Sequence, residues 1–246
     1  MNILLYTDVH LCARSSVIRT PGERYSMRLE NIIECMAWIN QLKKERNCKR
    51  CFCLGDYFDR PDLNAEELTA LKEIDVEGHE FIVGNHEGLT NDLRYASSHI
   101  FNSMGATVYS EPTILHIEDK IFLILPYAVE ADRIDIDKFL TDNNITDREN
   151  VVILSHNDIK GIQYGAFVSQ SGYEIEDIKK NCSLCVNGHI HNGAWLDNKL
   201  LNLGSLTGLN FSNDADKWQS VAAIYDTETG EIELINNPYA FNFFNI

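Results

Sequence analysis

The stretch Cys51-Phe52-Cys53-Leu54-Gly55-Asp56-Tyr57-Phe58-Asp59 decides the fold, because an apolar run ends there in a glycine and two acidic side chains. The run 51–54 predicts a short buried strand, and Gly55 suits a sharp turn with a close backbone approach. In open α/β sheets, ligands collect outside the carboxyl ends of the strands. We therefore expect Asp56 to lie at the edge of a sheet that carries the chemistry.

The same pattern recurs at four other places along the chain. Apolar runs precede Asp8-Val9-His10, Gly84-Asn85-His86-Glu87, Ser155-His156 and Gly188-His189-Ile190-His191. Five strand ends that deliver Asp, Asn and His side chains to one edge predict a metal site. Carboxylate and imidazole ligands together suit manganese, iron or zinc.

The number of candidate ligands indicates two metal ions. One tetrahedral ion cannot use them all, but a bridging carboxylate divides them into two sets of four. Two ions about 3.5–4 Å apart can activate a water and clamp both oxygens of an in-line displacement at phosphorus. The candidate ligands are Asp8, His10, Asp56, Asn85, His156, His189 and His191.

The spacing of the remaining apolar residues predicts the fold class. Residues 26–46 have the period of an amphipathic helix with Ser26 as its N-cap, and Asn64 with Glu67 forms a capping box for a short helix to about Ile74. The runs 199–203, 221–225 and 232–235 are typical of meandering antiparallel strands. We expect an α/β protein with two packed mixed sheets flanked by helices, in a single domain over residues 1–246.

The composition is that of a globular protein without a membrane span. Of the 246 residues, 44% are hydrophobic and 24% charged, and no apolar run approaches the length of about 20 residues that a span needs. The first residues lack the basic segment of a signal peptide. The seven cysteines suit a reducing environment, so we expect a cytoplasmic protein. The pairs Cys48/Cys51 and Cys182/Cys185 have zinc-site spacing, but buried strand thiols are the favoured interpretation.

The formal net charge of −16 restricts the substrates. A surface this acidic repels a polyanion unless basic groups or bound cations are concentrated locally. The charge therefore counts against a large nucleic-acid footprint, while bound metal ions would still attract a phosphate.

The motifs resemble the signature of calcineurin-like metallophosphoesterases. Their order is DxH, GDxxD, GNHE, a lone His after an apolar strand and then GHxH, and the match spans residues 8–191. The resemblance implies a four-layer α-β-β-α sandwich, two divalent ions (Mn²⁺ foremost, with Fe²⁺, Zn²⁺ or Mg²⁺ as alternatives) and hydrolysis of a phosphate ester by a water that the ions activate.

The resemblance also implies a role for each site residue. One ion would be held by Asp8, His10, Asp56 and His191, and the other by Asp56, Asn85, His156 and His189, with Asp56 bridging. His86 would protonate the leaving-group oxygen, and Asp59 would orient His86, its carboxylate keeping the imidazole protonated. For Arg60, bidentate phosphate binding stands beside a plain surface position.

Within that superfamily, the chain is most similar to the SbcD-type double-strand-break repair nucleases. The similarity rests on Leu125-Pro126-Tyr127, on Gly161 after His156, and on Asn202-Leu203-Gly204-Ser205-Leu206. It implies a nuclease or phosphodiesterase with a nucleic acid or nucleotide substrate, and a role in DNA repair. We expect a short form, because no segment is long enough for the DNA-capping domain or for the helices that bind an SMC-like ATPase partner.

Other interpretations stay open. The residues 55–60 and 84–87 also resemble protein Ser/Thr phosphatases, but those enzymes have Arg where this chain has Val83. A small-molecule or protein phosphatase is thus the alternative enzyme, and a non-catalytic binding scaffold is the alternative outside enzymes. Trp38 on the first helix suits either a homodimer face or core packing. The aromatic tail 239–244 suits packing better than a docking peptide.

Overall fold

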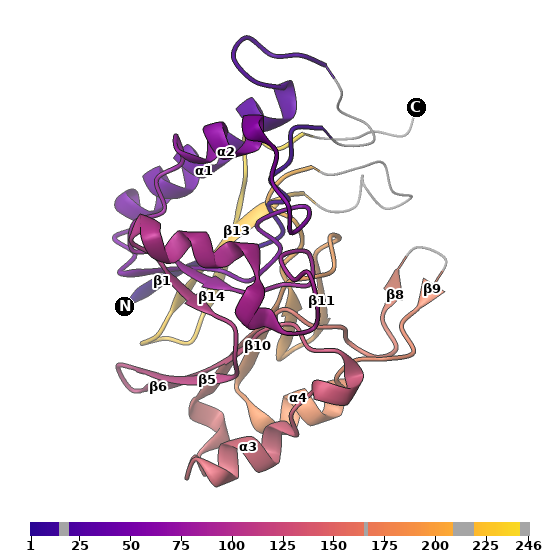
Figure 1. The fold of residues 1–246 in the computed structure, drawn as a ribbon. Coiled ribbons are helices and arrows are strands. Elements are labelled where there is room, and N and C mark those ends of the chain that lie inside the picture. Colours follow the sequence, from indigo (N-terminus) through magenta and orange to yellow (C-terminus); the bar gives the residue numbers. More distant parts are fainter. Residues whose placement is uncertain (15–19, 165–166, 209–218, 242–246) are drawn as a thin grey trace.

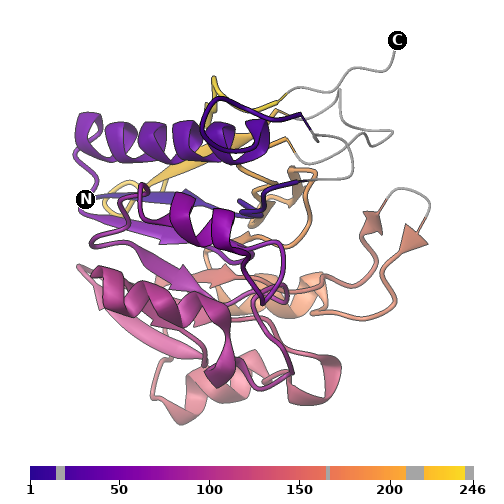
Figure 2. The same cartoon turned by 45° about the horizontal axis from the view of Figure 1, so that its top comes forward.

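The computed structural model describes residues 1–14, 20–164, 167–208 and 219–241. Two six-stranded sheets pack face to face between helices (Figure 1). Helices α1 and α2 cover the outer face of the first sheet, and α3 and α4 cover the outer face of the second (Figure 2). The predicted α/β fold with two mixed sheets in a four-layer sandwich is confirmed.

The first sheet has the strand order β14-β13-β1-β2-β3-β4. Strands β1 to β4 are parallel, β13 pairs antiparallel with β1, and β14 pairs antiparallel with β13. The first four strands therefore send their carboxyl ends to one edge. The bounds are β1 Asn2–Tyr6, β2 Arg50–Cys53, β3 Glu80–Ile82, β4 Thr107–Tyr109, β13 Val221–Asp226 and β14 Ile232–Asn236.

The second sheet has the order β11-β12-β10-β7-β6-β5. Its four central strands are parallel, and β5 and β11 are antiparallel edges. The bounds are β5 Thr113–Ile117, β6 Lys120–Leu125, β7 Val151–Ser155, β10 Leu184–Asn187, β11 Ala194–Asp197 and β12 Leu200–Asn202. A separate hairpin of β8 (Gln163–Tyr164) and β9 (Phe167–Val168) projects from the sandwich (Figure 1).

Four α-helices and four short 3₁₀ turns connect the strands in the described part of the chain. Within those residues, no helix combines the length and the apolar character that crossing a bilayer requires. The helices are α1 Met27–Glu45, α2 Ala65–Leu71, α3 Ile136–Asp142 and α4 Ile175–Asn181. The 3₁₀ turns are η1 Leu93–Tyr95, η2 Ser97–Met104, η3 Glu130–Asp132 and η4 Arg148–Asn150.

Helix α1 forms where its capping and its apolar period predict it. The Ser26 hydroxyl accepts a hydrogen bond from the backbone N–H of Leu29 at 3.2 Å, which satisfies one of the free donors of the first turn. Trp38 is half-buried and packs against the core of its own chain. This contact supports core packing, and a homodimer through this face stays a prediction.

The core is divided into three layers by the alternation of side chains along the strands. Leu4 faces the helices α1 and α2, while Ile3 and Leu5 face the second sheet. In β7, Val152 and Leu154 meet that central layer and Ile153 packs under α3 and α4. Because successive strand residues point to opposite faces, both sheets are buried on both sides.

The prediction of an antiparallel meander from the last three runs is wrong. Strand β12 pairs parallel with β10 in the second sheet, whereas β13 and β14 return to the first sheet beside β1. Of the three runs, only the last two pair with each other as an antiparallel hairpin, β13 with β14, while the antiparallel partner of β12 is the preceding strand β11. The short apolar runs indicate that strands form, but they do not indicate which strands pair. The packing of the two sheets determines the pairing.

All seven cysteines are buried and unpaired. Cys51 lies in β2 and Cys185 in β10, as expected for strand thiols. In the described residues, no group of metal-competent side chains includes a cysteine. Of the aromatic tail, Tyr239 is half-exposed and residues 242–246 lie outside the described part.

Candidate metal centre

The structure brings the predicted ligands together at one edge of the sandwich. Each follows the carboxyl end of a parallel strand: β1 and β2 precede Asp8 and Asp56, β3 precedes Asn85, and β7 and β10 precede His156 and His189. The two sheets, packed face to face, thus supply ligands to one common edge, as the rule for ligand sites in α/β sheets predicts.

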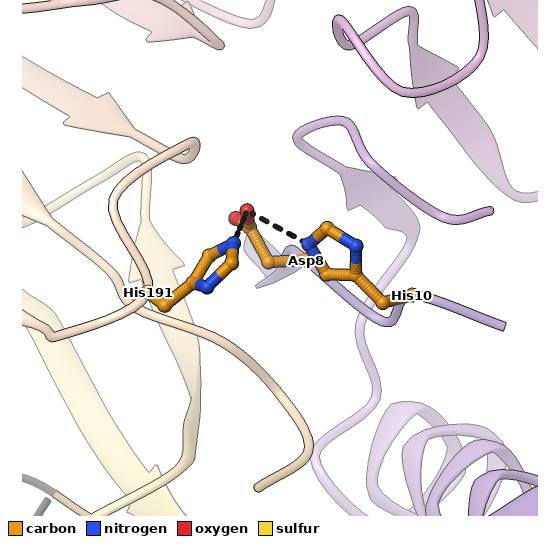
Figure 3. A group of neighbouring side chains, drawn as sticks. All are labelled: Asp8, His10 and His191. Carbon is orange, nitrogen blue, oxygen red and sulfur yellow. Dashed lines mark ion pairs between the residues drawn. The ribbon is translucent and has the colours of Figure 1, made fainter. Parts of the chain in front are cut away.

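The first group consists of Asp8, His10 and His191. The Nε2 atoms of both histidines lie 3.7 Å from Asp8 Oδ1. Figure 3 shows the two rings directed at this carboxylate from opposite sides, with His10 coming from the first sheet and His191 from the second. These spacings leave room for one cation between the three side chains.

The second group consists of Asp56, His156 and His189. Asp56 Oδ2 lies 3.1 Å from His156 Nε2, and Asn85 Oδ1 lies 2.9 Å from His189 Nδ1. The same Asp56 Oδ2 is 3.9 Å from His10 Nε2 of the first group. Asp56 therefore stands between the groups, where the bridging role predicted for it requires it to be.

Unpartnered atoms mark the site as suited to cations. Asp8 Oδ1, His10 Nε2, Asp56 Oδ2 and His156 Nε2 are buried and have no hydrogen-bond partner among the described residues. The other polar atoms of these side chains are largely occupied: Thr7 Oγ1 donates to Asp8 Oδ2 at 2.6 Å, for example. Buried polar atoms almost always have partners. Four exceptions in one place, all on carboxylate or imidazole, fit divalent ions.

Backbone strain is present at four of the predicted ligands. Asp8, His10, Asp56 and His189 have φ of 51°, 48°, 49° and 75°, in the left-handed region that non-glycine residues rarely adopt. Such strain costs about 1–3 kcal/mol per residue, persists only where the surrounding structure fixes the conformation, and clusters at active sites and ligand sites. Gly84 allows a close approach to a ligand, because a Cβ there would lie 2.1 Å from Asp56 Oδ1.

Asp56 and His156 hold each other in the charged form. Burial by itself raises the pKa of Asp56, but the charge and hydrogen bond of His156 lower it well below its usual range. Burial likewise opposes protonation of His156, yet Asp56 raises its pKa to about 9. Because a ligand imidazole must be neutral, metal binding here releases protons and becomes tighter as the pH rises.

His86 lies on the rim of the site, but Asp59 does not act on it as predicted. His86 Nδ1 donates to the backbone carbonyl of Asp59 at 2.7 Å, and its Nε2 lies 3.9 Å from Asp56 Oδ2. The Asp59 carboxylate instead lies 3.5 Å from His10 Nδ1. Asp59 therefore orients His86 through its main chain, and the expected carboxylate–His86 pair is corrected to a carboxylate–His10 pair.

Arg60 is engaged by a buried acid. Its Nη2 lies 2.5 Å from Glu67 Oε2, and the same carboxyl group accepts hydrogen bonds from the backbone N–H groups of Asn64 at 2.9 Å and Ala13 at 2.7 Å. The capping box of α2 is thus confirmed and extended to the segment after His10. Phosphate binding by Arg60 stays a prediction, and Nη2 could take part in it only if this pair opened.

Three supporting residues were not predicted from the sequence. Asp158 Oδ1 accepts from His189 Nε2 at 3.0 Å, and Arg133 Nη2 donates to Asp158 Oδ2 at 3.1 Å. The buried Glu87 carboxyl accepts from the backbone N–H groups of Gly84 at 2.7 Å and Phe58 at 3.0 Å, joining two ligand turns. Proximity to His156 and membership of GNHE were the signals that could have indicated Asp158 and Glu87.

A sandwich that gathers carboxylates and imidazoles at one sheet edge is the arrangement of a metal-dependent hydrolase. The family model for calcineurin-like phosphoesterases matches residues 1–193. The chain therefore belongs to the calcineurin-like phosphoesterase family, whose members are metal-dependent phosphoesterases.

One solved structure supports the fold directly, and others are similar at lower scores. TT1561 of Thermus thermophilus is 12% identical, with 96% of this chain and 98% of that chain covered and a TM-score of 0.53. A dimetal phosphatase from Danio rerio is 13% identical, with coverage of 96% and 98% and a TM-score of 0.49. The phosphoesterase YfcE from E. coli is 11% identical, with coverage of 96% and 100% and a TM-score of 0.45. Among curated proteins, none matches the chain.

Proposed function

We propose that this chain is a two-metal phosphodiesterase that acts as a single domain over residues 1–246. Its substrates would be nucleotide esters and short or single-stranded nucleic acids. The observation that carries the proposal is the set of four unpartnered buried ligand atoms on Asp8, His10, Asp56 and His156. The sequence resemblance to SbcD-type nucleases favours a diester over a monoester.

Each predicted ligand has a place in this proposal. Asp8, His10 and His191 would hold one ion and Asn85, His156 and His189 the other, with Asp56 shared. Two bound divalent ions, with Mn²⁺ the first choice, would supply a nucleophilic water and positive charge for the phosphoryl oxygens. The protein's own side chains would perform the remaining part of the reaction, on the leaving-group side.

His86 is suited to the leaving-group side of the reaction. A carbonyl oxygen can only accept, so the proton on Nδ1 is committed to Asp59. Nε2 is then the atom that can carry a proton to the departing oxygen. His86 has a side chain 36% exposed, compared with 1% for Asp56, so substrate can reach it. Imidazole is the side chain that most readily exchanges a proton near neutral pH.

The surface charge limits the size of the substrate. The net charge of −16, from 37 acidic and 21 basic side chains, repels a long polyanion. We therefore expect short single strands and flexible ends to be cut better than blunt duplex. Each phosphate neutralised on a single strand contributes about −0.7 to the slope of log affinity against log salt, so the slope should be shallow.

A substrate panel tests the proposal. It consists of single-stranded and blunt duplex DNA, cyclic nucleotides, bis-p-nitrophenyl phosphate and p-nitrophenyl phosphate, each with Mn²⁺ and with Asp56→Asn as the inactive control. Cleavage of single strands and of the diester supports the proposal. Turnover of p-nitrophenyl phosphate alone would establish a monoesterase instead, and inactivity on every substrate would favour a binding scaffold.

A further inference from the structure

A hollow of about 220 Å³ lies at the edge that carries the metal ligands. Its walls are formed by residues 91–94, 110–112 and 125–129, together with Tyr173 and two residues of the segment before α3. The first three segments follow the carboxyl ends of β3, β4 and β6. The hollow therefore continues the crevice in which α/β sheets bind their ligands, but none of the predicted metal ligands lines it.

Tyr127 joins the hollow to the metal centre. Its ring is half-buried, lines the hollow, and lies with its centroid 5.7 Å from that of the His189 ring. Its backbone N–H donates to the carbonyl of Val83 at 3.0 Å, two residues before Asn85. A group bound over Tyr127 is thus next to the side of the centre formed by Asn85 and His189.

The lining suits a flat ring rather than a second phosphate. Leu93, Pro112 and Ile134 supply apolar surface, and Tyr127 and Tyr173 supply aromatic surface. Such a surface binds planar rings by stacking and by excluding water.

The charges of the lining disfavour an anion. Three acids, Asp92, Glu111 and Asp132, face a single guanidinium, that of Arg94. Both Nε and Nη2 of Arg94 already donate to Asp92, at 2.8 Å and 2.7 Å. The hollow therefore carries excess negative charge and offers acceptors, which suit an uncharged ring with N–H donors.

We propose that the hollow binds the nucleoside of the scissile nucleotide, with its base on the ring of Tyr127, while the phosphate ester lies on the predicted metal ligands. This inference rests on the proposed function and specifies its substrate class. A base inside a duplex is stacked between its neighbours and must leave the stack to lie on another ring, so we expect the substrate to be a mononucleotide ester or an unpaired strand end.

The test compares two diesters with the same leaving group. Thymidine 5′-(p-nitrophenyl phosphate) has the nucleoside, and methyl p-nitrophenyl phosphate does not. Stacking on an aromatic side chain contributes about 1–3 kcal/mol per base. Tyr127→Ala should therefore lower the ratio of the two kcat/KM values about 5- to 150-fold. Tyr127→Phe, which keeps the ring, should preserve the ratio.

Two further variants control for folding and position. Ser110→Trp adds a large ring to the lining of the hollow and should lower the same ratio, which makes it decisive if Tyr127→Ala does not fold. Tyr95→Ala removes an exposed tyrosine that follows the lining segment without joining it, and should leave the ratio unchanged. An unchanged ratio in folded Tyr127→Ala or Ser110→Trp overturns the inference while the phosphodiesterase proposal stands.

If there is no turnover, a binding measurement tests the nucleoside site separately from the phosphodiesterase function. If the wild type hydrolyses neither ester, the proposed function fails. Saturation-transfer NMR with thymidine then tests the hollow directly. A signal in the wild type and in Tyr127→Phe that is lost in Tyr127→Ala supports the nucleoside site, and absence of a wild-type signal overturns it.

Discussion

At the scale of single residues, the geometry of His86 leads to a prediction about leaving groups. Because Nδ1 is held by the Asp59 carbonyl, Nε2 is free to donate a proton, and general-acid catalysis typically contributes about 10²–10⁴-fold. A sugar alkoxide needs that proton, whereas p-nitrophenolate leaves without it. His86→Ala should therefore slow cleavage of a dinucleotide by about that factor and slow a p-nitrophenyl diester far less, in steady-state assays with Mn²⁺.

The control for His86 is Asp59→Asn, which keeps the backbone carbonyl. It should leave the leaving-group selectivity intact, since its side chain faces His10 instead. Equal slowing of both substrates by His86→Ala, with metals still bound, would mean that His86 positions phosphate and donates no proton.

Asp158 is predicted to act through His189. Carboxylates that orient a ligand imidazole typically contribute about 10- to 100-fold to metal affinity. Asp158→Asn should weaken one of two Mn²⁺ binding events by about that factor in isothermal titration calorimetry and leave the other nearly unchanged. Asp177→Asn, in an exposed pair with Lys180 on α4, is the matched control. Two unaltered binding events in Asp158→Asn would show that the contact has no such role.

His79 predicts a stability change with pH outside the metal centre. It is buried between Tyr6 and Asn40, and burial, assisted by the charge of Lys43, lowers its pKa to about 4. The unfolded chain, with an ordinary pKa near 6.5, binds the proton first, so stability is lost as the pH falls from about 6.5 towards 4.

Lowering the pH from 7 to 5 should reduce the free energy of unfolding by about 2 kcal/mol through protonation of this histidine in the unfolded chain. Urea titrations should therefore show a smaller difference between the two pH values in His79→Gln than in the wild type. His116→Gln, at an exposed strand position, should keep the wild-type difference. If His79→Gln showed the same difference in unfolding free energy between pH 7 and pH 5 as the wild type, groups other than His79 would be responsible for the loss of stability.

At the scale of elements, α1 supports the ligand turn after β1 through a buried arginine. The guanidinium of Arg28 donates to the carbonyls of Val9 and Gly208, each at 3.0 Å, and to Thr207 Oγ1 at 2.7 Å. Loss of such charge-assisted bonds leaves buried carbonyls with fewer partners. Arg28→Leu should destabilise the fold by about 3 kcal/mol in chemical denaturation, and a wild-type midpoint would contradict this.

The control for Arg28 is Arg24→Leu, just before the same helix. Arg24 is exposed and pairs only with Glu73 and the ring of Tyr25 among the described residues. Its removal should leave the denaturation midpoint unchanged, because exposed pairs contribute little to stability.

Elements with strong local signals were predictable from the sequence, and the others were not. The strand ends before Asp56 and His156 combine an apolar run with a change to polar residues, so both the strands and the site edge were predicted. Helices α3 and α4 have seven residues each, which is too short for a clear helical period. The contact of Asp59 with His10 rather than His86 depends on side-chain direction, which spacing does not encode.

At the scale of the whole molecule, metal binding should stabilise the fold. Without a cation, two carboxylates and two imidazoles keep unpartnered buried atoms. A ligand present at about 100 times its Kd stabilises by about 2.7 kcal/mol. Differential scanning calorimetry should thus give a higher Tm with Mn²⁺ than with EDTA. Asp56→Asn should reduce this shift more than Asp8→Asn, because Asp56 faces both ligand groups. Equal Tm values in Mn²⁺ and EDTA for the wild type would contradict the two-metal site.

The pairing of β1 with β13 has a consequence for synthesis on the ribosome. Leu4 lies opposite Ile224. One edge of β1 therefore stays unpaired until β13, some two hundred residues later in the chain, has been synthesised. Meanwhile β2 can pair with the other edge, and the second sheet, from β5 to β12, can form from contiguous chain. The nascent protein therefore carries an open, apolar strand edge through most of its translation, which is the kind of surface that chaperones protect from aggregation.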